Sequence, residues 1–404
     1  DKDTGRKRCC QGSGGFDKEE HGMNGKRIKT EDIGVVCFYL AFIYELVLRV
    51  LEKNDIFFQY EHIGWGIALG CYVLKILCTR YTKKEWIIIA LFGVISVIAM
   101  VTCGNMAYLT IALFVIASKG IDRRNVMTLT GMALFCMTIL VMVRCLLGIS
   151  GTLVDVANFG RGGDEMRYRF GFSHANQFHY AVFCIMAVYL WLQKTKANVC
   201  QYLVLLIVNT AVFYLTRSRT GAGLCYLMIF GNIAMQYCKT LRNSKLVYKC
   251  GYAIFTIVVI LAIIAVRVDT DNYPLLWKLD MALTGRFNSA YRTLTPYPLG
   301  FIANKSFGQT DMGLAMQAYQ FGLLYTIIFV LLIYGLLRKI ESEKNASDYI
   351  LLLAVIGYIL TENQQAIGRT PSESFIWLLL IDQWYCLFRK ERGTSSYLWR
   401  IGKR

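Results

Sequence analysis

Residues 161–180 read RGGDEMRYRFGFSHANQFHY, and residues 181–193, which follow them, read AVFCIMAVYLWLQ. The first segment carries three arginines and two acids, whereas the second is almost wholly apolar. The charged segment therefore ends at a membrane surface, where a helical span begins. Charge near a bilayer is costly and is usually retained for a function. We expect this junction to belong to the functional site.

Similar apolar blocks recur along the whole chain. Of its 404 residues 55% are hydrophobic, and blocks of about 17–22 apolar residues have the length of a membrane-spanning helix. Lipid-exposed backbone must satisfy its own hydrogen bonds, which favours helices. We expect an all-α, polytopic membrane helical bundle of about twelve transmembrane helices. The expected spans cover residues 34–51, 57–78, 86–102, 105–118, 126–149, 177–193, 199–216, 221–237, 249–267, 319–337, 347–362 and 373–388. The fourth span, at 105–118, is the shortest, and a re-entrant segment is its alternative interpretation.

The chain divides into a membrane domain and two polar ends. Residues 31–390 are expected to form a single polytopic membrane domain. Residues 1–30 form an N-terminal extension and residues 391–404 a basic tail, both predicted to be cytoplasmic. Met23 precedes a basic segment and the first span, so we expect residues 1–22 to be an upstream extension.

The net charge of +17 has its simplest explanation in membrane orientation. Lysines and arginines gather in short connections between spans, and these connections alternate correctly if all of them are cytoplasmic. No basic domain stands apart from the spans, so no nucleic-acid partner is expected. Loops 150–176 and 268–318 then face the extracytoplasmic side. The predicted location is the cell membrane of a bacterium (the inner or plasma membrane), crossed many times, with the lipid bilayer as a partner.

The outer loops are poor in lysine but hold several arginines. They are Arg161, Arg167, Arg169, Arg217, Arg219, Arg286, Arg292 and Arg369. Orientation signals do not explain arginines on the translocated side. Because the guanidinium group is planar and matches phosphate oxygens in bidentate fashion, the pattern predicts an outer site for an anionic ligand, most simply a phosphate.

The large extracytoplasmic loop, 268–318, has a helical pattern of its own. Apolar residues recur at helical spacing between Leu276 and Leu294, which predicts a short amphipathic helix on the interface or on the top of the bundle. Arg286 lies at the edge of this apolar stripe and can point into a cavity.

Three stretches together resemble elements of the bacterial O-antigen polymerase and O-antigen ligase superfamily, the Wzy-like polymerases. Arg169-Phe-Gly-Phe-Ser-His174-Ala-Asn176 is similar to the Gly-Phe-x-His-Pro-Asn element of many polysaccharide polymerases. Leu215-Thr-Arg217-Ser-Arg219-Thr-Gly221 resembles a Ser-x-Ser-Arg-Thr element at an outer span junction. The third stretch is Thr284-Gly-Arg286 in the large loop. With the span pattern, the resemblance covers about residues 30–390.

One departure from the family pattern distinguishes two activities. Ligases of this superfamily carry a histidine, a small polar residue, nine residues, and then Gly-x-x-(Gly/Thr/Tyr). Here the matching run is Asp311-Met312, nine residues and then Gly322-Leu-Leu-Tyr325. The spacing is kept, but an aspartate replaces the histidine. The departure favours a polymerase over a ligase and makes Asp311 a candidate for the histidine's role.

The resemblance implies a metal-independent glycosyl transfer that joins oligosaccharide repeat units on the outer face. Both substrates would be polyprenyl-pyrophosphate-linked oligosaccharides: a growing glycan as donor and a single repeat unit as acceptor. The product would be a capsule, an exopolysaccharide or an O-antigen. A flippase and a chain-length regulator of the same pathway would be partners. No cofactor and no metal are expected.

Transfer from a pyrophosphate needs two kinds of catalytic group. The developing charge of the leaving group must be stabilised, and the acceptor hydroxyl must lose a proton. Four arginines are candidates for the pyrophosphate, and Glu362 is a candidate for sugar hydroxyls. The arginines are Arg169, Arg217, Arg219 and Arg286. Asp311 and His174 are the candidate bases, and His174 has an alternative role as the cap of the following span.

Other functions fit the same spans. A ligase would share the fold and differ in its acceptor. A transporter or flippase of lipid-linked oligosaccharides would also need many spans, but such proteins often show two similar halves with charged or broken helices at mid-membrane. No internal repeat is evident here, and the charge lies in the outer loops. The sequence therefore favours the polymerase over the transporter.

Overall fold

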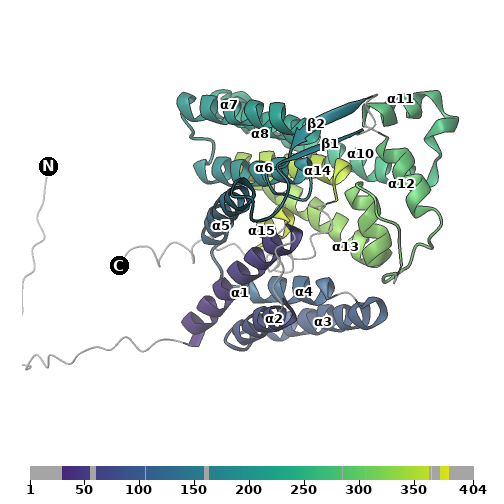
Figure 1. Ribbon diagram of the computed structural model, residues 1–404. Helices are drawn as coiled ribbons and strands as arrows, with labels where there is room; N and C mark the ends of the chain where they lie inside the picture. The colour runs from purple at the N-terminus through teal and green to yellow at the C-terminus, as the bar shows by residue number, and fades with distance from the viewer. Residues whose placement is uncertain are drawn as a thin grey trace, which may run out of the picture.

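The computed structural model shows a helical protein with one small antiparallel hairpin (Figure 1). The residues that it describes are 30–54, 61–104, 106–158, 163–283, 285–304, 306–363, 365 and 374–381. The N-terminal extension, the basic tail and most of the connection 363–372 lie outside these ranges, as do Arg161, Thr284 and Arg369.

Every expected span contains a helix over its described residues. The first six are α1 (Thr30–Lys53), α2 (Glu61–Leu77), α3 (Lys83–Cys103), α4 (Ala107–Ala117), α5 (Arg123–Leu146) and α6 (Ala175–Gln193). The next six are α7 (Val199–Thr216), α8 (Arg219–Tyr237), α10 (Lys245–Arg267), α13 (Gly313–Glu343), α14 (Ala346–Thr361) and α15 (Phe375–Leu380). A short helix, α9 (Lys239–Asn243), links α8 to α10.

The lengths of these helices identify a multi-pass membrane protein. Over the described ranges, seven helices are long and apolar enough to cross a membrane: α1, α3, α5, α6, α7, α10 and α13. Three shorter apolar helices, α2, α4 and α14, lie among them. The 11 residues of α4 extend only about 16 Å at 1.5 Å per residue, against a hydrocarbon core of about 30 Å. The total of twelve spans therefore remains a prediction.

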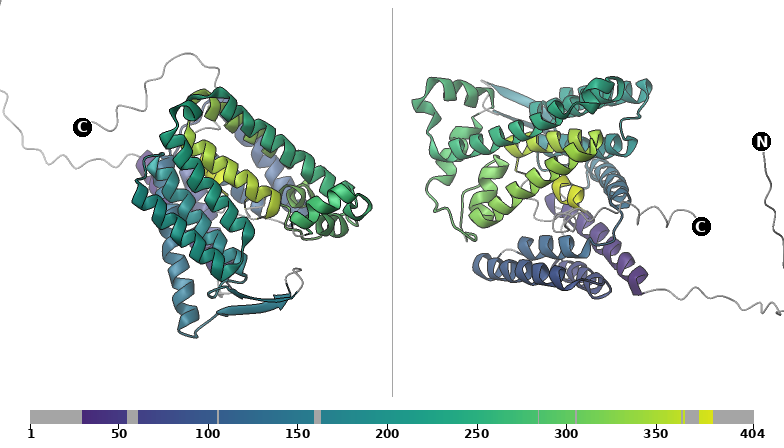
Figure 2. Two further views of the ribbon diagram at one scale, coloured as in Figure 1. Left: turned by 90° about the horizontal axis from the view of Figure 1, so that it is seen from above. Right: turned by 180° about the vertical axis from the view of Figure 1, so that it is seen from behind.

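Helix α14 lies at the centre of the bundle. It packs against α6, α8, α10 and α13 (Figure 2), and most of its residues are buried. A helix that is apolar all round is expected in such a central position. Near its first turn, Asp348 accepts a hydrogen bond from Trp191 Nε1 at 2.6 Å and pairs with Arg123 Nη1 at 2.9 Å. This cluster joins the start of α5, the end of α6 and the start of α14.

The loop charges predict that successive connections alternate between the two sides of the membrane, and this packing agrees with that prediction. Arg123, Trp191 and Asp348 belong to chain segments predicted to share the cytoplasmic side, and they meet at one end of the bundle. At the opposite ends of α6 and α14, residues of the predicted outer loops also meet, as the next subsection describes. Which of the two ends is cytoplasmic remains a prediction.

Loop 150–176, which is predicted to face the outer side, contains a β-hairpin that the sequence analysis did not predict. Strands β1 (Val154–Asn158) and β2 (Asp164–Tyr168) pair antiparallel, with Val154 opposite Tyr168. The hairpin projects from the helical bundle (Figure 2). Its return to the membrane is tight, because Gly171 has a φ of +87° and a Cβ atom there would lie 2.7 Å from the Cβ of Cys145. The hairpin thus brings the chain back to the start of α6 in a fixed position.

The large loop carries two short helices in place of the single amphipathic helix expected between Leu276 and Leu294. They are α11 (Pro274–Ala282) and α12 (Arg286–Leu294), preceded by the 3₁₀ turn η1 (Thr270–Asn272). The helix is interrupted because Gly285 adopts a φ of +75°, which is left-handed backbone. Helix α12 packs on one end of the bundle, since Phe287, Ala290 and Leu294 are buried in a cluster with residues of α10 and α13. The apolar residues of α11, by contrast, are mostly exposed.

Helix α13 is broken at Gly322, where the large loop enters the bundle. Gly322 has φ +80° and ψ 169°, and a Cβ atom there would lie 2.4 Å from the carbonyl group of Ile302. The backbone N–H groups of Leu323 and Leu324 donate to the carbonyls of Gly300 and Phe301 at 3.0 and 2.9 Å. The loop thus provides acceptors for the second part of α13. This explains why a glycine is needed at the position that the family resemblance singled out.

Candidate functional site

His174 is the N-cap of α6. Its Nδ1 accepts a hydrogen bond from the backbone N–H of Asn176 at 3.1 Å, which satisfies one of the free donors of the first helical turn. The capping role considered for this residue is therefore confirmed. Burial lowers the pKa of His174, the Arg167 guanidinium lowers it further, and the Asp311 carboxylate opposes this shift. The imidazole is consequently neutral at pH 7, and its proton lies on Nε2 because Nδ1 is an acceptor.

An ion pair between Arg286 and Glu362 forms the centre of the site. Arg286 is the first residue of α12, and Glu362 follows the last residue of α14. Arg286 Nη2 lies 2.9 Å from Glu362 Oε1, and the Nδ2 group of Asn176 donates to the same oxygen at 3.4 Å. Three segments far apart in the chain are therefore joined at one carboxylate.

Asp311 lies at the exposed side of this pair. Its Oδ2 is 3.7 Å from Arg286 Nη1, and 66% of its side chain is exposed, against 12% for Arg286. The Nδ2 group of Asn363 donates to the carbonyl of Thr310 at 3.0 Å, which fastens the segment before α13 to the end of α14. Asp311 is thus held beside Arg286 but is open to solvent. Sequence spacing alone could not place Asp311 and Glu362 on the same arginine.

Burial controls the ionisation of Glu362. The residue is only 7% exposed, and burial raises the pKa of its carboxyl group. The Arg286 guanidinium lowers this pKa and the Asp311 carboxylate raises it, with a net upward shift. The charged form of Glu362 therefore depends on Arg286 remaining in place.

Arg167 lies on β2 and Arg169 lies just after it, and the two side chains have different surroundings. Arg169, a predicted ligand of the pyrophosphate, is half-buried and donates from Nη1 to the carbonyl of Ser173 at 3.1 Å. Arg167 is almost fully buried and pairs with Glu165 at 2.7 Å. The structure gives Arg167 an electrostatic effect on His174 that the sequence analysis had not assigned. Arg169 lies beyond the end of β2, so the alternation of side chains along the strand does not extend to it.

Arg217 and Arg219 lie at the α7–α8 turn and are exposed. Arg217 ends α7 with a left-handed φ of +53°, and its guanidinium stacks on the ring of Tyr214 at 4.6 Å. No ion pair joins either arginine to Glu362 or Asp311 among the described residues. The structure therefore brings together His174, Arg286, Asp311 and Glu362 but leaves these two predicted ligands outside the central cluster.

A buried polar network fixes the α7–α8 turn beside α6. His179 Nδ1 lies 3.0 Å from Thr216 Oγ1, and its Nε2 lies 3.2 Å from Asn209 Oδ1. Gly221 allows this approach, because a Cβ atom there would lie 2.7 Å from the His179 ring. His179 thus has a packing and hydrogen-bonding role. The network sets the position of the turn that carries Arg217 and Arg219.

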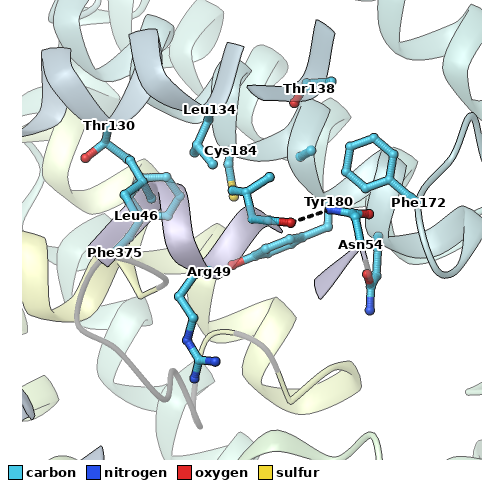
Figure 3. A pocket seen from close by; sticks show the side chains of 13 residues that line it. Leu46, Arg49, Asn54, Thr130, Leu134, Thr138, Phe172, Tyr180, Cys184 and Phe375 are labelled. Atoms are coloured by element: carbon cyan, nitrogen blue, oxygen red, sulfur yellow. Dashed lines mark hydrogen bonds between the residues drawn. The ribbon is translucent and has the colours of Figure 1, made fainter. Parts of the chain in front are cut away.

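An apolar cavity of about 70 Å³ lies on the other side of the first turns of α6 (Figure 3). Its walls come from α1, α5, α6 and α15, and include Leu46, Leu134, Phe172, Ala181 and Phe375. Gln177 lines the cavity, while its neighbour Asn176 contacts Glu362. The start of α6 therefore separates a polar cluster from an apolar cavity.

Polar atoms in the cluster retain unused hydrogen-bonding capacity. Arg286 Nη1 and Thr310 Oγ1 are buried and have no hydrogen-bond partner. Within the part of the chain that the structure describes, no group of three or more His, Cys, Asp or Glu side chains could hold a metal ion. The cluster is therefore suited to a ligand that accepts hydrogen bonds from a guanidinium group, such as an oxyanion.

Comparison with known proteins gives no relative from which a function can be transferred. No protein-family profile, curated protein or solved structure matches the chain. The function must therefore be argued from the arrangement of residues in the cluster.

The Arg286–Glu362 pair predicts a pH-dependent loss of stability. Arg286→Ala leaves a buried carboxylate without its cation and should lower the free energy of unfolding at pH 7.5 by about 3 kcal/mol. The folded-state pKa of Glu362 is already raised, and the substitution raises it further. A carboxyl group whose pKa is higher in the folded than in the unfolded state stabilises the fold when it is protonated. This contribution is complete below the unfolded-state pKa and is lost as the pH rises through the folded-state pKa. The variant should therefore recover part of its stability at pH 5.5.

Thermal unfolding of the purified protein in detergent at the two pH values measures this effect. Arg292→Ala is the matched control, because its pair with Asp271 is exposed and should contribute little. Adding Glu362→Gln to Arg286→Ala should remove the pH dependence. Equal destabilisation of Arg286→Ala at both pH values would show that the pair is not a buried ion pair.

Proposed function

We propose that this protein is a membrane polymerase that joins polyprenyl-pyrophosphate-linked oligosaccharide repeat units on the extracytoplasmic face. The observation that carries the proposal is the Arg286–Glu362 pair, with Asp311 beside it and the start of α6 against it. The cluster gathers residues from three predicted outer loops at one end of a membrane bundle. Two of them, Asp311 and Arg286, belong to stretches that resemble the polymerase and ligase superfamily.

The reaction would be a displacement at the anomeric carbon of the donor glycan. A hydroxyl oxygen of the acceptor repeat unit forms the new C–O bond, and the bond from this carbon to the pyrophosphate oxygen breaks. The leaving group is polyprenyl pyrophosphate, and the proton of the hydroxyl passes to a base. No oxidant, nucleotide or metal enters this balance, and the energy comes from the donor's own pyrophosphate linkage.

Arg286 is the proposed group for the leaving pyrophosphate. Its Nη1 atom has no hydrogen-bond partner and lies on the side of the exposed Asp311, so it retains a donor for a phosphate oxygen. A guanidinium group remains charged and can stabilise the negative charge that develops during bond breaking. Arg169, Arg217 and Arg219 are proposed to supply further contacts to the diphosphate, and Glu362 orients Arg286 as well as binding sugar hydroxyls.

The geometry of the two candidate bases favours Asp311 over His174. The Nδ1 atom of His174 is occupied as the acceptor of the α6 cap, and the Nε2 atom of the neutral ring carries the proton. His174 would have to give up the cap to accept a proton. Asp311 is exposed beside Arg286, where an acceptor hydroxyl can reach it. A carboxylate can orient such a hydroxyl and take its proton late in the displacement, as in inverting glycosidases.

The cavity beside the start of α6 is compatible with a lipid-linked donor but is small. Its wall includes Phe172, Gln177 and Cys184 as well as the charged Arg49, and its volume is about 70 Å³. It could admit only a short segment of a hydrocarbon chain, whose polar head would then lie near the start of α6. A flippase and a chain-length regulator are proposed as partners of the same pathway. The position of the charged cluster at the end of the bundle also fits a surface transferase better than a transporter, whose site would lie at mid-membrane.

The proposed orientation predicts the labelling of single cysteines introduced into a variant whose 14 native cysteines are replaced by serine. Gly163→Cys in the hairpin and Ser306→Cys in the large loop are exposed positions and should both react with a membrane-impermeant maleimide in intact cells. Lys196→Cys, in the connection between α6 and α7, is the matched control and should react only after permeabilisation. If only Lys196→Cys were labelled in intact cells, the topology would be the reverse of the proposed one, and the proposal would be overturned.

The proposed role of Arg286 predicts that polymer formation depends on its shape as well as its charge. Arg286→Ala should abolish polymer in a host that lacks its own polymerase. Arg286→Lys should lower it by about tenfold or more, because a lysine cannot form the bidentate contact. Arg124→Ala, an exposed arginine at the opposite end of the bundle, should make normal polymer. Gel analysis of the glycan, normalised to protein level, gives the result; normal polymer from Arg286→Ala would refute the proposed site.

The choice of base predicts opposite results for two substitutions. Asp311→Asn should stop chain growth while retaining binding of the donor, because the amide cannot take the proton. His174→Asn should keep most of the activity, since asparagine caps helices well. Polymer length and retention of a radiolabelled lipid-linked donor can be measured on the same membranes. Normal growth in Asp311→Asn together with an inactive His174→Asn would transfer the role of base to His174.

A further inference from the structure

Asp280 is a buried carboxylate in the large loop that the proposed reaction does not use. It is the one residue of α11 that is buried, with 3% of its surface exposed. Its Oδ1 accepts a hydrogen bond from the backbone N–H of Phe287 at 2.7 Å, and its Oδ2 accepts from the N–H of Asn288 at 3.2 Å. The hydroxyl of Thr270 donates to Oδ2 at 3.4 Å. The donors thus come from the first turn of α12 and from the turn before α11.

These contacts make Asp280 the cap of a helix to which it does not belong. The N-cap position of α12 is Gly285, which has no side chain to offer. The first N–H groups of a helix need acceptors, and a negative charge there interacts favourably with the helix dipole. No ion pair links Asp280 to another described side chain, so its buried charge is stabilised mainly by these N–H groups. The carboxylate and the start of α12 therefore depend on each other.

The first residue of this capped helix is Arg286. Its neighbours Phe287 and Asn288 are the residues whose N–H groups bind Asp280, so the carboxylate fixes the direction and rotation of α12 at this point. Phe287 is also fully buried in the cluster that α12 forms with α10 and α13, which holds the same turn against these helices. We propose that Asp280 is the positioning residue for Arg286, which it holds in the orientation that reaches Glu362. The inference rests on the proposed function for its catalytic consequence, but its structural part can be tested separately.

A double-mutant cycle measures whether Asp280 acts through Arg286. Thermal unfolding midpoints are compared for the full chain in detergent, for Arg286→Ala, for Glu362→Gln and for the double variant. Residues in contact give non-additive effects, and a shift of about 2–4 °C from additivity is expected for this pair. The cycle is then repeated with Asp280→Ala. If Asp280 positions Arg286, the coupling between Arg286 and Glu362 should disappear in this background.

Two further variants distinguish a positioning role of Asp280 from a general loss of stability. Asp280→Asn should retain most of the coupling, because its amide oxygen can still accept from Phe287 and asparagine is as good a cap as aspartate. Asp271→Ala is the matched control: Asp271 contacts the Asn288 side chain and Arg292 on the exposed side of α12, and its loss should leave the coupling intact. Unchanged coupling in Asp280→Ala, or equal loss in Asp271→Ala, would overturn the inference. If Asp280→Ala does not fold, retained coupling in Asp280→Asn supports the proposal and its loss there overturns it.

Polymer formation tests the catalytic consequence in the same variants. Asp280→Ala should lower it by about a hundredfold, the effect expected of a misplacement of about 1 Å in a catalytic group, and Asp280→Asn should restore it. If Arg286→Ala makes normal polymer, the proposed function of Arg286 fails, while the unfolding cycle still decides whether Asp280 positions that residue. The failure of one proposal can therefore be distinguished from the failure of the other.

Discussion

A buried carboxylate needs a cation or several hydrogen-bond donors, and this requirement acts at both ends of the central helix α14. At one end Asp348 is paired with Arg123 and bound by Trp191; at the other Glu362 is paired with Arg286 and contacted by Asn176. Removing either cation would leave a charge in a poorly solvated place, at a cost of several kcal/mol. The two pairs thus join helices that are distant in the chain, and α6 and α14 take part at both ends. The pair at Glu362 also brings together segments of the loops that are predicted to face the outer side.

The sequence was sufficient for features that depend on local pattern. Apolar length predicted the helices, and loop charge predicted which segments would meet, as Arg123 and Asp348 do at one end. The loops that carry Arg286, Asp311 and Glu362 were predicted to lie on one side, but the contact between these residues was not predicted. What the sequence did not reveal depends on contacts between distant segments. The hairpin at Val154–Tyr168, the break at Gly322 and the cap by Asp280 each need a partner that no local pattern specifies.

The charges of the candidate site explain why its arginine remains available to a ligand. Glu362 occupies one side of the Arg286 guanidinium, whereas Nη1 has only the more distant Asp311 beside it. Two carboxylates share one cation, so the cluster by itself is not strongly positive. An anionic ligand would have to compete with Asp311, or draw on arginines of neighbouring segments such as Arg169. Such a balance favours brief occupancy by an anionic ligand, as the proposed transfer reaction would require for release of its leaving group.

The broken helix α13 also bears on how the protein is made. The N–H groups that begin its second part donate to carbonyl groups of residues 300 and 301, which belong to a loop predicted to face the outer side. A nascent chain entering the bilayer must satisfy its backbone within the segment that is being inserted, and the loop is not yet folded at that moment. We therefore expect residues 313–343 to enter as an ordinary continuous helix and to acquire the break at Gly322 only when the loop folds onto it. Maturation of the outer surface would then be a late step in biogenesis, after translocation.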